Sequence, residues 1–414
     1  MPASLGLFFT LLVVALLIAL AASARASARF RFLLCTALLL RVVGAFAYYV
    51  TATKVYGKAD AQLYLRDGVA YAAQIWQGDF SMFSDLGSHF WGTGFVSLLT
   101  GVTSAVVGPG FIANNIVYSM AAFGGLYAMA SAFRRSYPTV PVARYARWIW
   151  LFPSLWFWPA GIGKDAILLL GFGLAMNGFV GDRGRVRWPS FLVGCACMFA
   201  IRPQVMAVVV FSMVFAQWMS RERRWSFARV VQALLFVVAA VVLIRVALQH
   251  VGIEDTQGVS DYLAERATHT AAGRSAVTSV GTNPLAAPFA AFNVLFRPLP
   301  WDVASVTGAL AMLEIYAFWF FAFRRRANIR NALRHWRSER FLSASLAFTL
   351  IYATILGMVI VNLGIIARQR TVLFPCMFLF LEALPAAPQG PNALDEAVSL
   401  IPVEEFVEPL VLRA

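Results

Sequence analysis

Long apolar runs separated by short polar segments set the pattern of this chain. A helix of about 17–25 apolar residues crosses a bilayer, and eleven runs reach or approach that length. They cover residues 5–23, 32–50, 111–133, 146–160, 164–181, 189–201, 203–220, 230–249, 303–324, 341–364 and 371–387. The pattern predicts an all-α fold: a polytopic transmembrane helical bundle of about 11 spans with juxtamembrane helices at its outer face.

We expect a single transmembrane domain over residues 1–387. Residues 388–414 are proline-rich and acidic, and they are predicted to form a cytoplasmic tail. The first run is followed by AASARASA, which resembles the small-residue cleavage site of a signal peptide. A cleaved leader is therefore the alternative to a first span.

Composition supports the membrane class. The 414 residues are 60% hydrophobic and 13% charged, whereas soluble domains average about 45–50% and about 25%. The four cysteines lie inside apolar runs, so no disulfide framework is predicted. The net charge of +14 comes mostly from arginines in short loops. That distribution is typical of membrane topology and excludes a basic surface for nucleic acid.

Five arginine clusters orient the bundle. They hold 21 of the 34 cations: Arg25, Arg29, Arg31; Arg134, Arg135, Arg144, Arg147; Arg183, Arg185, Arg187; Arg221, Arg223, Arg224, Arg229; and Arg324, Arg325, Arg326, Arg330, Arg334, Arg337, Arg340. Positive loops face the cytoplasm. The prediction requires 90–108 to be an interfacial or re-entrant segment. It places loops 51–110 and 250–302 outside, where they would form the site.

The stretch from Asp60 to Asp79 is predicted to be an amphipathic helix at the membrane surface. Asp60 and Tyr64 are four residues apart and share a helical face. Asp60 is the first candidate for a general base or for the anchor of an acceptor group, with Tyr64 as a substrate contact. Asp67 is the reserve candidate, and Arg66 is placed to hold either carboxylate. The alternative is a solvated charge on a surface helix.

Several other charges lie outside in this topology, against the usual bias. The candidates for phosphate binding are Lys164, Arg202, Arg297, Arg368 and Arg370, and Asp165 is a candidate catalytic acid. Arginine suits phosphate because its planar fork donates two parallel hydrogen bonds. The alternatives are helix caps, interface anchors and snorkelling side chains. The histidines lack metal-like spacing, so no metal ligand is assigned. No cofactor is assigned either, and a divalent cation stays open.

These motifs together resemble the GT-C superfamily of multi-pass glycosyltransferases. Asp60-Ala61-Gln62-Leu63-Tyr64 is similar to the acidic motif in the first outer loop of that superfamily. Lys164-Asp165 is similar in position to the second acid of aminoarabinose and protein mannosyl transferases.

Further motifs resemble uncharacterised bacterial membrane proteins found with surface-polysaccharide functions. They are Pro153-Ser154, Ile201-Arg202-Pro203, Phe296-Arg297-Pro298 and Arg368-Gln369-Arg370 with Pro375. The resemblance covers residues 32–387. The chain departs from the superfamily by an extra span before the first loop and by lacking a soluble C-terminal domain of the oligosaccharyltransferase kind.

The resemblance implies transfer of a sugar from a polyprenyl-phosphate donor to a glycan or lipid acceptor. The expected location is a bacterial inner membrane with the site facing the periplasm, and the expected role is in cell-surface polysaccharide or envelope biosynthesis. The partners would be the donor, the acceptor and membrane lipids, with no nucleic acid. An O-antigen-type polymerase or ligase would rely instead on Arg266, Arg274 and Arg297. A transporter or flippase of a lipid-linked solute would show inverted repeats and charges along a path.

Overall fold

The computed structural model describes residues 3–55, 57, 60–84, 90–182, 185–219, 284–303 and 305–383. These residues form helices joined by turns, with one isolated bridge between Asp182 and Arg185. The all-α prediction is confirmed for them. The predicted span 230–249, the tail 388–414, Arg266 and Arg274 lie outside the described residues.

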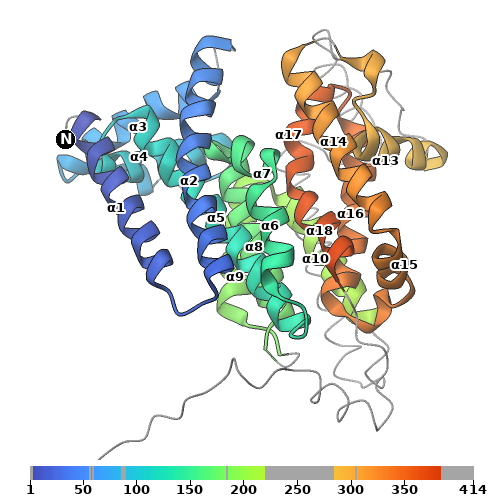
Figure 1. The fold of residues 1–414 in the computed structure, drawn as a ribbon. Helices are drawn as coiled ribbons and strands as arrows, with labels where there is room; N and C mark the ends of the chain where they lie inside the picture. Colours follow the sequence, from blue (N-terminus) through green and yellow to red (C-terminus); the bar gives the residue numbers. More distant parts are fainter. Residues whose placement is uncertain are drawn as a thin grey trace, which may run out of the picture.

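Figure 1 shows the helices that the structure describes, which fall into two series, one before residue 220 and one after residue 283. In the first half they are α1 (Ala3–Ser23), α2 (Ala28–Val50) continued by a π-helical turn (Thr51–Val55), α3 (Asp60–Trp76), α4 (Gly92–Val107), α5 (Phe111–Ser136), α6 (Val142–Leu151), α7 (Pro153–Phe157), α8 (Lys164–Val180), α9 (Trp188–Ile201) and α10 (Pro203–Met219). In the second half they are α13 (Ala287–Phe296), α14 (Val306–Arg324), α15 (Arg326–Arg334), α16 (Arg340–Val359), α17 (Leu363–Gln369) and α18 (Phe374–Glu382). Single 3-10 turns cover Ser81–Phe83, Trp158–Ala160, Pro284–Ala286, Pro300–Asp302, Trp336–Ser338 and Arg370–Val372.

The chain is a helical membrane protein. Five of the described helices are long and apolar enough to cross a bilayer: α1, α2 with its π-helical turn, α5, α14 and α16. The pair formed by α17 with its 3-10 turn and α18, bent by 56°, makes a sixth if it counts as one span. Helices α4, α9, α10 and α13 are apolar but shorter. The expected count of about 11 spans is therefore not confirmed.

Helix α8 lies at the centre of the fold because glycines let its neighbours approach closely. A Cβ on Gly173 would lie 2.0 Å from the carbonyl oxygen of Gly125 in α5. On its other side, a Cβ on Gly171 would lie 2.8 Å from the carbonyl oxygen of Gly194 in α9. Small residues allow this close backbone packing in membrane helices. These contacts fix the height and rotation of α8 between α5 and α9.

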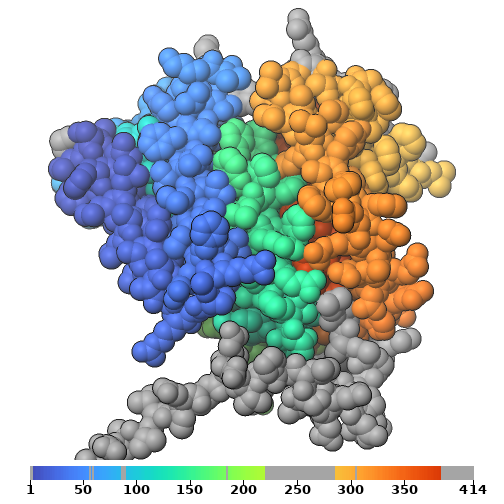
Figure 2. All heavy atoms as spheres, viewed as in Figure 1, coloured from blue at the N-terminus to red at the C-terminus, as the bar shows by residue number. Residues whose placement is uncertain are grey.

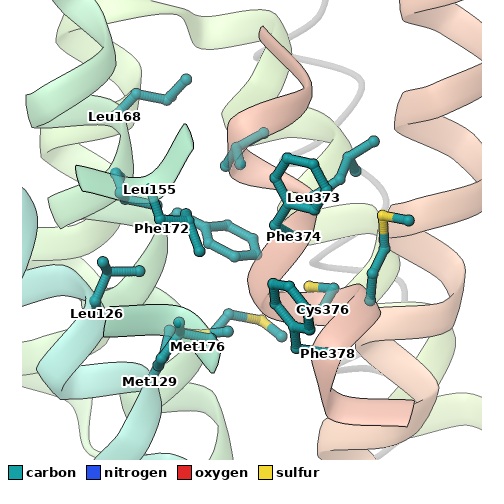
Figure 3. Close-up of a cluster of buried hydrophobic side chains, with 14 of the residues drawn as sticks. Leu126, Met129, Leu155, Leu168, Phe172, Met176, Leu373, Phe374, Cys376 and Phe378 are labelled. Atoms are coloured by element: carbon teal, nitrogen blue, oxygen red, sulfur yellow. The ribbon is translucent and has the colours of Figure 1, made fainter. Parts of the chain in front are cut away.

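Large apolar side chains join the two halves of the chain. In Figure 3, Phe172 and Met176 of α8 face Phe374 and Phe378 of α18, with Leu155 of α7 beside them. Figure 2 shows α6–α8 (green) between α1–α2 (blue) and α14–α16 (orange). Burial against these neighbours is the main stabilising contribution of α8, since most of its residues are inaccessible.

Prolines mark two breaks between helices. The run 146–160 is not one helix: α6 ends at Leu151, Phe152 is extended with ψ 128°, and α7 begins at Pro153. A residue before proline avoids the helical conformation, which hydropathy alone does not register. In the run 189–220, the same effect of Pro203 separates α9 from α10 at Arg202, whose φ and ψ are −150° and 81°. The break between the predicted spans 189–201 and 203–220 is thus present at Arg202, and α9 packs on α8 whereas α10 packs on α16.

A buried carboxylate closes one end of the bundle. Glu382 in α18 is fully buried and accepts hydrogen bonds from Arg144 Nε (2.9 Å), Arg147 Nη2 (3.4 Å) and Trp148 Nε1 (2.7 Å) of α6. Arg325, after α14, adds an ion pair at 2.8 Å. The α1–α2 connection and α15 lie toward the same lower end in Figure 1. We call this the arginine-rich end, and the opposite end the site end.

Candidate functional site

Asp165 is the centre of a charged cluster at the site end. It occupies the first turn of α8, where the helix N-terminus favours negative charge. Its side chain is buried, and Arg368 of α17 donates from Nε to Asp165 Oδ2. Arg202 approaches from the α9–α10 break, with Nη2 at 3.4 Å from Asp165 Oδ1. Three segments distant in sequence therefore converge on one carboxylate.

The cluster carries more positive than negative charge. Arg202, Arg368 and Lys164 surround the single carboxylate of Asp165, and Lys164 lies close enough to act on its charge. Lys164 also reaches α4, since a Cβ on Gly92 would be 3.8 Å from Lys164 Nζ. The side chains of Arg202 and Arg368 are 16% and 30% exposed. Cations that are mostly removed from water attract an anion strongly.

Helix α3 brings Asp60 and Tyr64 within electrostatic range of this cluster. Asp60 is exposed in the first turn of α3, and Tyr64 is buried one turn later. Burial, followed by the charge of Asp60, raises the pKa of Tyr64 to about 12, against the opposing effect of Arg368. Tyr64 therefore stays a neutral phenol at ordinary pH and acts as a hydrogen-bond donor. Asp60 is also near enough for its charge to act on Arg368.

Tyr48 of α2 forms the wall beside the start of α8. A Cβ on Gly161 would lie 2.0 Å from Tyr48 Cε1, so only glycine allows the ring to rest there. The Gly161–Gly163 connection is thereby held against α2 directly before Lys164 and Asp165. Tyr48 is also close enough to Arg368 to influence it electrostatically.

Tyr352 was not predicted from the sequence. It lies on α16, is 4% exposed, and is within electrostatic range of Arg202 and Asp165. The side chains of Tyr352 and Arg202 interact by a hydrogen bond, and no other acceptor among the described residues reaches the buried Tyr352 hydroxyl or Arg202 Nη1. One feature of the sequence could have indicated Tyr352: it lies inside an apolar span, away from the interface belt where tyrosines concentrate.

The other candidate residues have their partners elsewhere. Arg66 binds its neighbour Asp67 through Nε (3.2 Å) and Nη2 (3.1 Å) on the outer face of α3. Arg297 binds Asp302 through Nε at 2.8 Å, within the turn that precedes α14. Arg370 is fully buried, and its Nη1 donates to the carbonyl oxygens of Val294 (3.0 Å) and Arg297 (2.7 Å). Asp67, Arg297 and Arg370 thus lie in contacts distinct from the Asp165 cluster.

Metal ligation finds no support in the part of the chain that the structure describes, where no group of three or more His, Cys, Asp or Glu could hold an ion. Cys195 and Cys197 are partly buried along α9, and Cys376 is buried in α18. The cluster combines two arginines and a lysine with one buried carboxylate, and an exposed carboxylate lies within electrostatic range.

The fold and this cluster define a helical membrane protein with a cationic site at one end of its bundle. No family model matches the chain, and no curated protein or solved structure is found to be similar to it.

Proposed function

We propose that the protein transfers a sugar from a polyprenyl-phosphate donor to a glycan or lipid acceptor at the outer face of the membrane. The observation that carries this proposal is the Asp165 cluster. Three cations surround one carboxylate at the end of an apolar bundle, with Asp60 within electrostatic range. A lipid-linked phosphate reaches such a site from the bilayer, and an acceptor reaches it from water.

Asp60 is the base in this mechanism. Its carboxylate takes the proton of the acceptor hydroxyl as that oxygen attacks the anomeric carbon. The new bond joins the acceptor oxygen to this carbon. The bond from this carbon to the phosphate oxygen breaks, and polyprenyl phosphate leaves with the electron pair. Attack opposite the leaving group inverts the sugar configuration.

Arg202, Arg368 and Lys164 stabilise the phosphate that leaves. Negative charge develops on its oxygens in the transition state, where preorganised donors are most effective. Asp165 acts here as a positioning residue, because it aligns both guanidinium groups while leaving a positive surplus. Tyr64, a neutral phenol, donates a hydrogen bond to the substrate.

The arrangement of charge favours an outer site. The Glu382 cluster joins arginines of two of the five arginine clusters at the arginine-rich end, and Arg135 and Arg187 pair with Asp182 at the α8–α9 connection. Arginine-rich loops face the cytoplasm. The site end would then face outward, in agreement with the use of polyprenyl-linked donors there.

The test compares two carboxylates of the same helix. Membranes with equal amounts of wild-type protein, Asp60→Asn or Asp67→Asn receive a radiolabelled polyprenyl-phosphate sugar, and transfer is measured. We expect Asp60→Asn to lose about 10²- to 10⁴-fold and Asp67→Asn to retain activity, because Asp67 is bound to Arg66 in the exposed face of α3. Loss in Asp67→Asn alone would move the base to Asp67.

A transporter of a lipid-linked solute is the second candidate, and buried charges inside the bundle favour it. Arg41 is fully buried on α2, where Nη1 donates to Leu155 O at 2.7 Å. Glu314 of α14 accepts from the backbone N–H of Ser154 at 2.5 Å and lies within range of Arg370. Ionisable groups inside membranes often mark transport pathways. Wild-type protein that moves labelled polyprenyl phosphate across liposomes, and transfers no sugar from any donor, would establish this second function.

A further inference from the structure

Two buried hydrogen-bond donors lie side by side in the Asp165 cluster, where the Tyr352 oxygen accepts from Arg202 and no other acceptor among the described residues reaches either group. They are the hydroxyl of Tyr352 and Nη1 of Arg202. A buried donor without an acceptor costs free energy. A ligand that supplies the acceptor removes that cost.

The two donors meet where helices α10 and α16 pack together. Arg202 directly precedes α10, and Tyr352 projects from α16. Tyr352 is within electrostatic range of both Arg202 and Asp165. An acceptor atom placed against Arg202 Nη1 therefore lies near the Tyr352 hydroxyl as well.

Asp165 does not supply that acceptor. Its Oδ2 accepts from Arg368, and its Oδ1 faces Nη2 of Arg202, the other terminal nitrogen of the same guanidinium. The missing ligand must offer acceptor oxygens on the far side of Arg202. It is expected to be anionic, because the two arginines share the one carboxylate of Asp165. A phosphate group has both properties.

We infer that Tyr352 and Arg202 bind the phosphate group of the polyprenyl carrier, with the Tyr352 hydroxyl donating to one phosphate oxygen. This inference rests on the proposed function for the identity of the carrier. It makes Tyr352 a substrate-binding residue and places the phosphate on the α10–α16 side of Asp165. Arg368, on the other side of Asp165, then faces the sugar end of the donor.

Tyr137 provides a matched control. Its hydroxyl is buried as well and has no partner among the described residues, but it lies just beyond the end of α5, at the arginine-rich end. Replacement of either tyrosine by phenylalanine removes a single oxygen and leaves the ring. Any general effect of deleting a buried hydroxyl appears in both variants.

The experiment measures binding of radiolabelled undecaprenyl phosphate to purified full-length protein in a scintillation proximity assay. We expect Tyr352→Phe to weaken binding about tenfold or more, since hydrogen bonds to charged groups are the stronger kind. Arg202→Gln weakens it further, and Tyr137→Phe leaves it unchanged. Unchanged binding in Tyr352→Phe, or equal weakening in both tyrosine variants, would overturn the inference.

Competitors identify the source of the phosphate. Unlabelled undecaprenyl phosphate should displace the label, whereas undecaprenol and inorganic phosphate at the same concentration should not. Displacement by inorganic phosphate would assign the site to free phosphate and overturn the carrier assignment. Displacement by undecaprenol would show that the tail alone binds, which also overturns it.

Thermal stability separates a ligand-binding role from a structural one. Without ligand, Tyr352→Phe should melt close to the temperature of the wild type, because the hydroxyl's partner among the described residues is Arg202, which keeps its ion pair with Asp165. A lower melting temperature would make the hydroxyl structural. The binding assay needs no sugar transfer, so a wild type that transfers nothing but binds undecaprenyl phosphate through Tyr352 would refute the proposed function and leave this inference standing.

Discussion

Asp165 and Glu382 are buried carboxylates at opposite ends of the bundle, and arginines surround both. Glu382 is fully buried and receives donors from Arg144, Arg147, Arg325 and Trp148. Those three arginine side chains are 27–43% exposed. Water can therefore solvate the positive charge of these arginines that Glu382 does not neutralise. Asp165 binds only two arginines, yet Arg202 is 16% exposed and has a buried nitrogen whose partner among the described residues is Tyr352.

This difference separates a structural junction from a site. Around Glu382, every part of the carboxylate is occupied, and water solvates the remaining positive charge. Around Asp165, Arg202 is mostly buried and keeps a buried nitrogen that no acceptor other than Tyr352 reaches among the described residues, and burying such a donor costs free energy. The number of arginines is thus less informative than the exposure of the groups left over.

The largest expected effect is on catalysis. Arg368→Gln should reduce sugar transfer by about 10²- to 10³-fold, the usual effect of removing one donor that stabilises charge in the transition state. Its counterpart at the other end, Arg147→Gln, should leave the rate within about twofold, because Arg147 is exposed and its bond to Glu382 is long. Initial rates at matched protein amounts measure both. Equal losses in the two variants would refute the distinction between the clusters.

The next effect is on stability. Glu382→Gln should lower the free energy of unfolding by about 3 kcal/mol, toward the lower end for a broken buried pair, since the arginines can still reach water. Thermal melting in detergent measures the change, and transfer per folded molecule should stay as in the wild type. A variant that melts normally but transfers no sugar would mean that Glu382 belongs to the functional machinery.

The smallest effect concerns a third ion pair, between Arg297 and Asp302, which lies outside the spans. Hydrogen bonds from Arg297 hold the pKa of Asp302 below its ordinary value. The stability from this pair is complete above the unfolded pKa of about 3.9 and is lost as pH falls through the lower folded pKa. Wild type should melt above Asp302→Asn near neutral pH, and the gap should shrink below about pH 4. A gap independent of pH would show that the charge of Asp302 does not contribute.

Much of the secondary structure follows from local pattern. Apolar runs predicted helices close to α1, α5, α8, α14 and α16, and Pro203 marked the break at Arg202. The run 146–160 was misjudged because hydropathy is the same for a continuous helix and a broken one. Helix α2 extends to Val55 through a π-helical turn, beyond the predicted end at residue 50.

The candidate site was predictable only in part. Arg202 and Arg368 were selected as cations on the unexpected side of the topology and Asp165 as an acid at the start of a span, and the structure brings these three together. The same criterion also selected Arg370, two residues after Arg368. A helix turns by about 100° per residue, so these neighbours face different directions, and Arg370 binds backbone carbonyls of α13 and its following residue.

Local patterns were enough to identify a helical membrane protein, because long apolar runs are stable in a bilayer and arginine clusters mark one side of it. They also pointed to the charges that lie on the unexpected side. The packing of the helices then selects which of these charges meet. Close glycine contacts set the position of α8, and the break at Pro203 aims Arg202 back toward Asp165. Such convergence depends on the packing of segments far apart in the chain, which no local pattern of residues records.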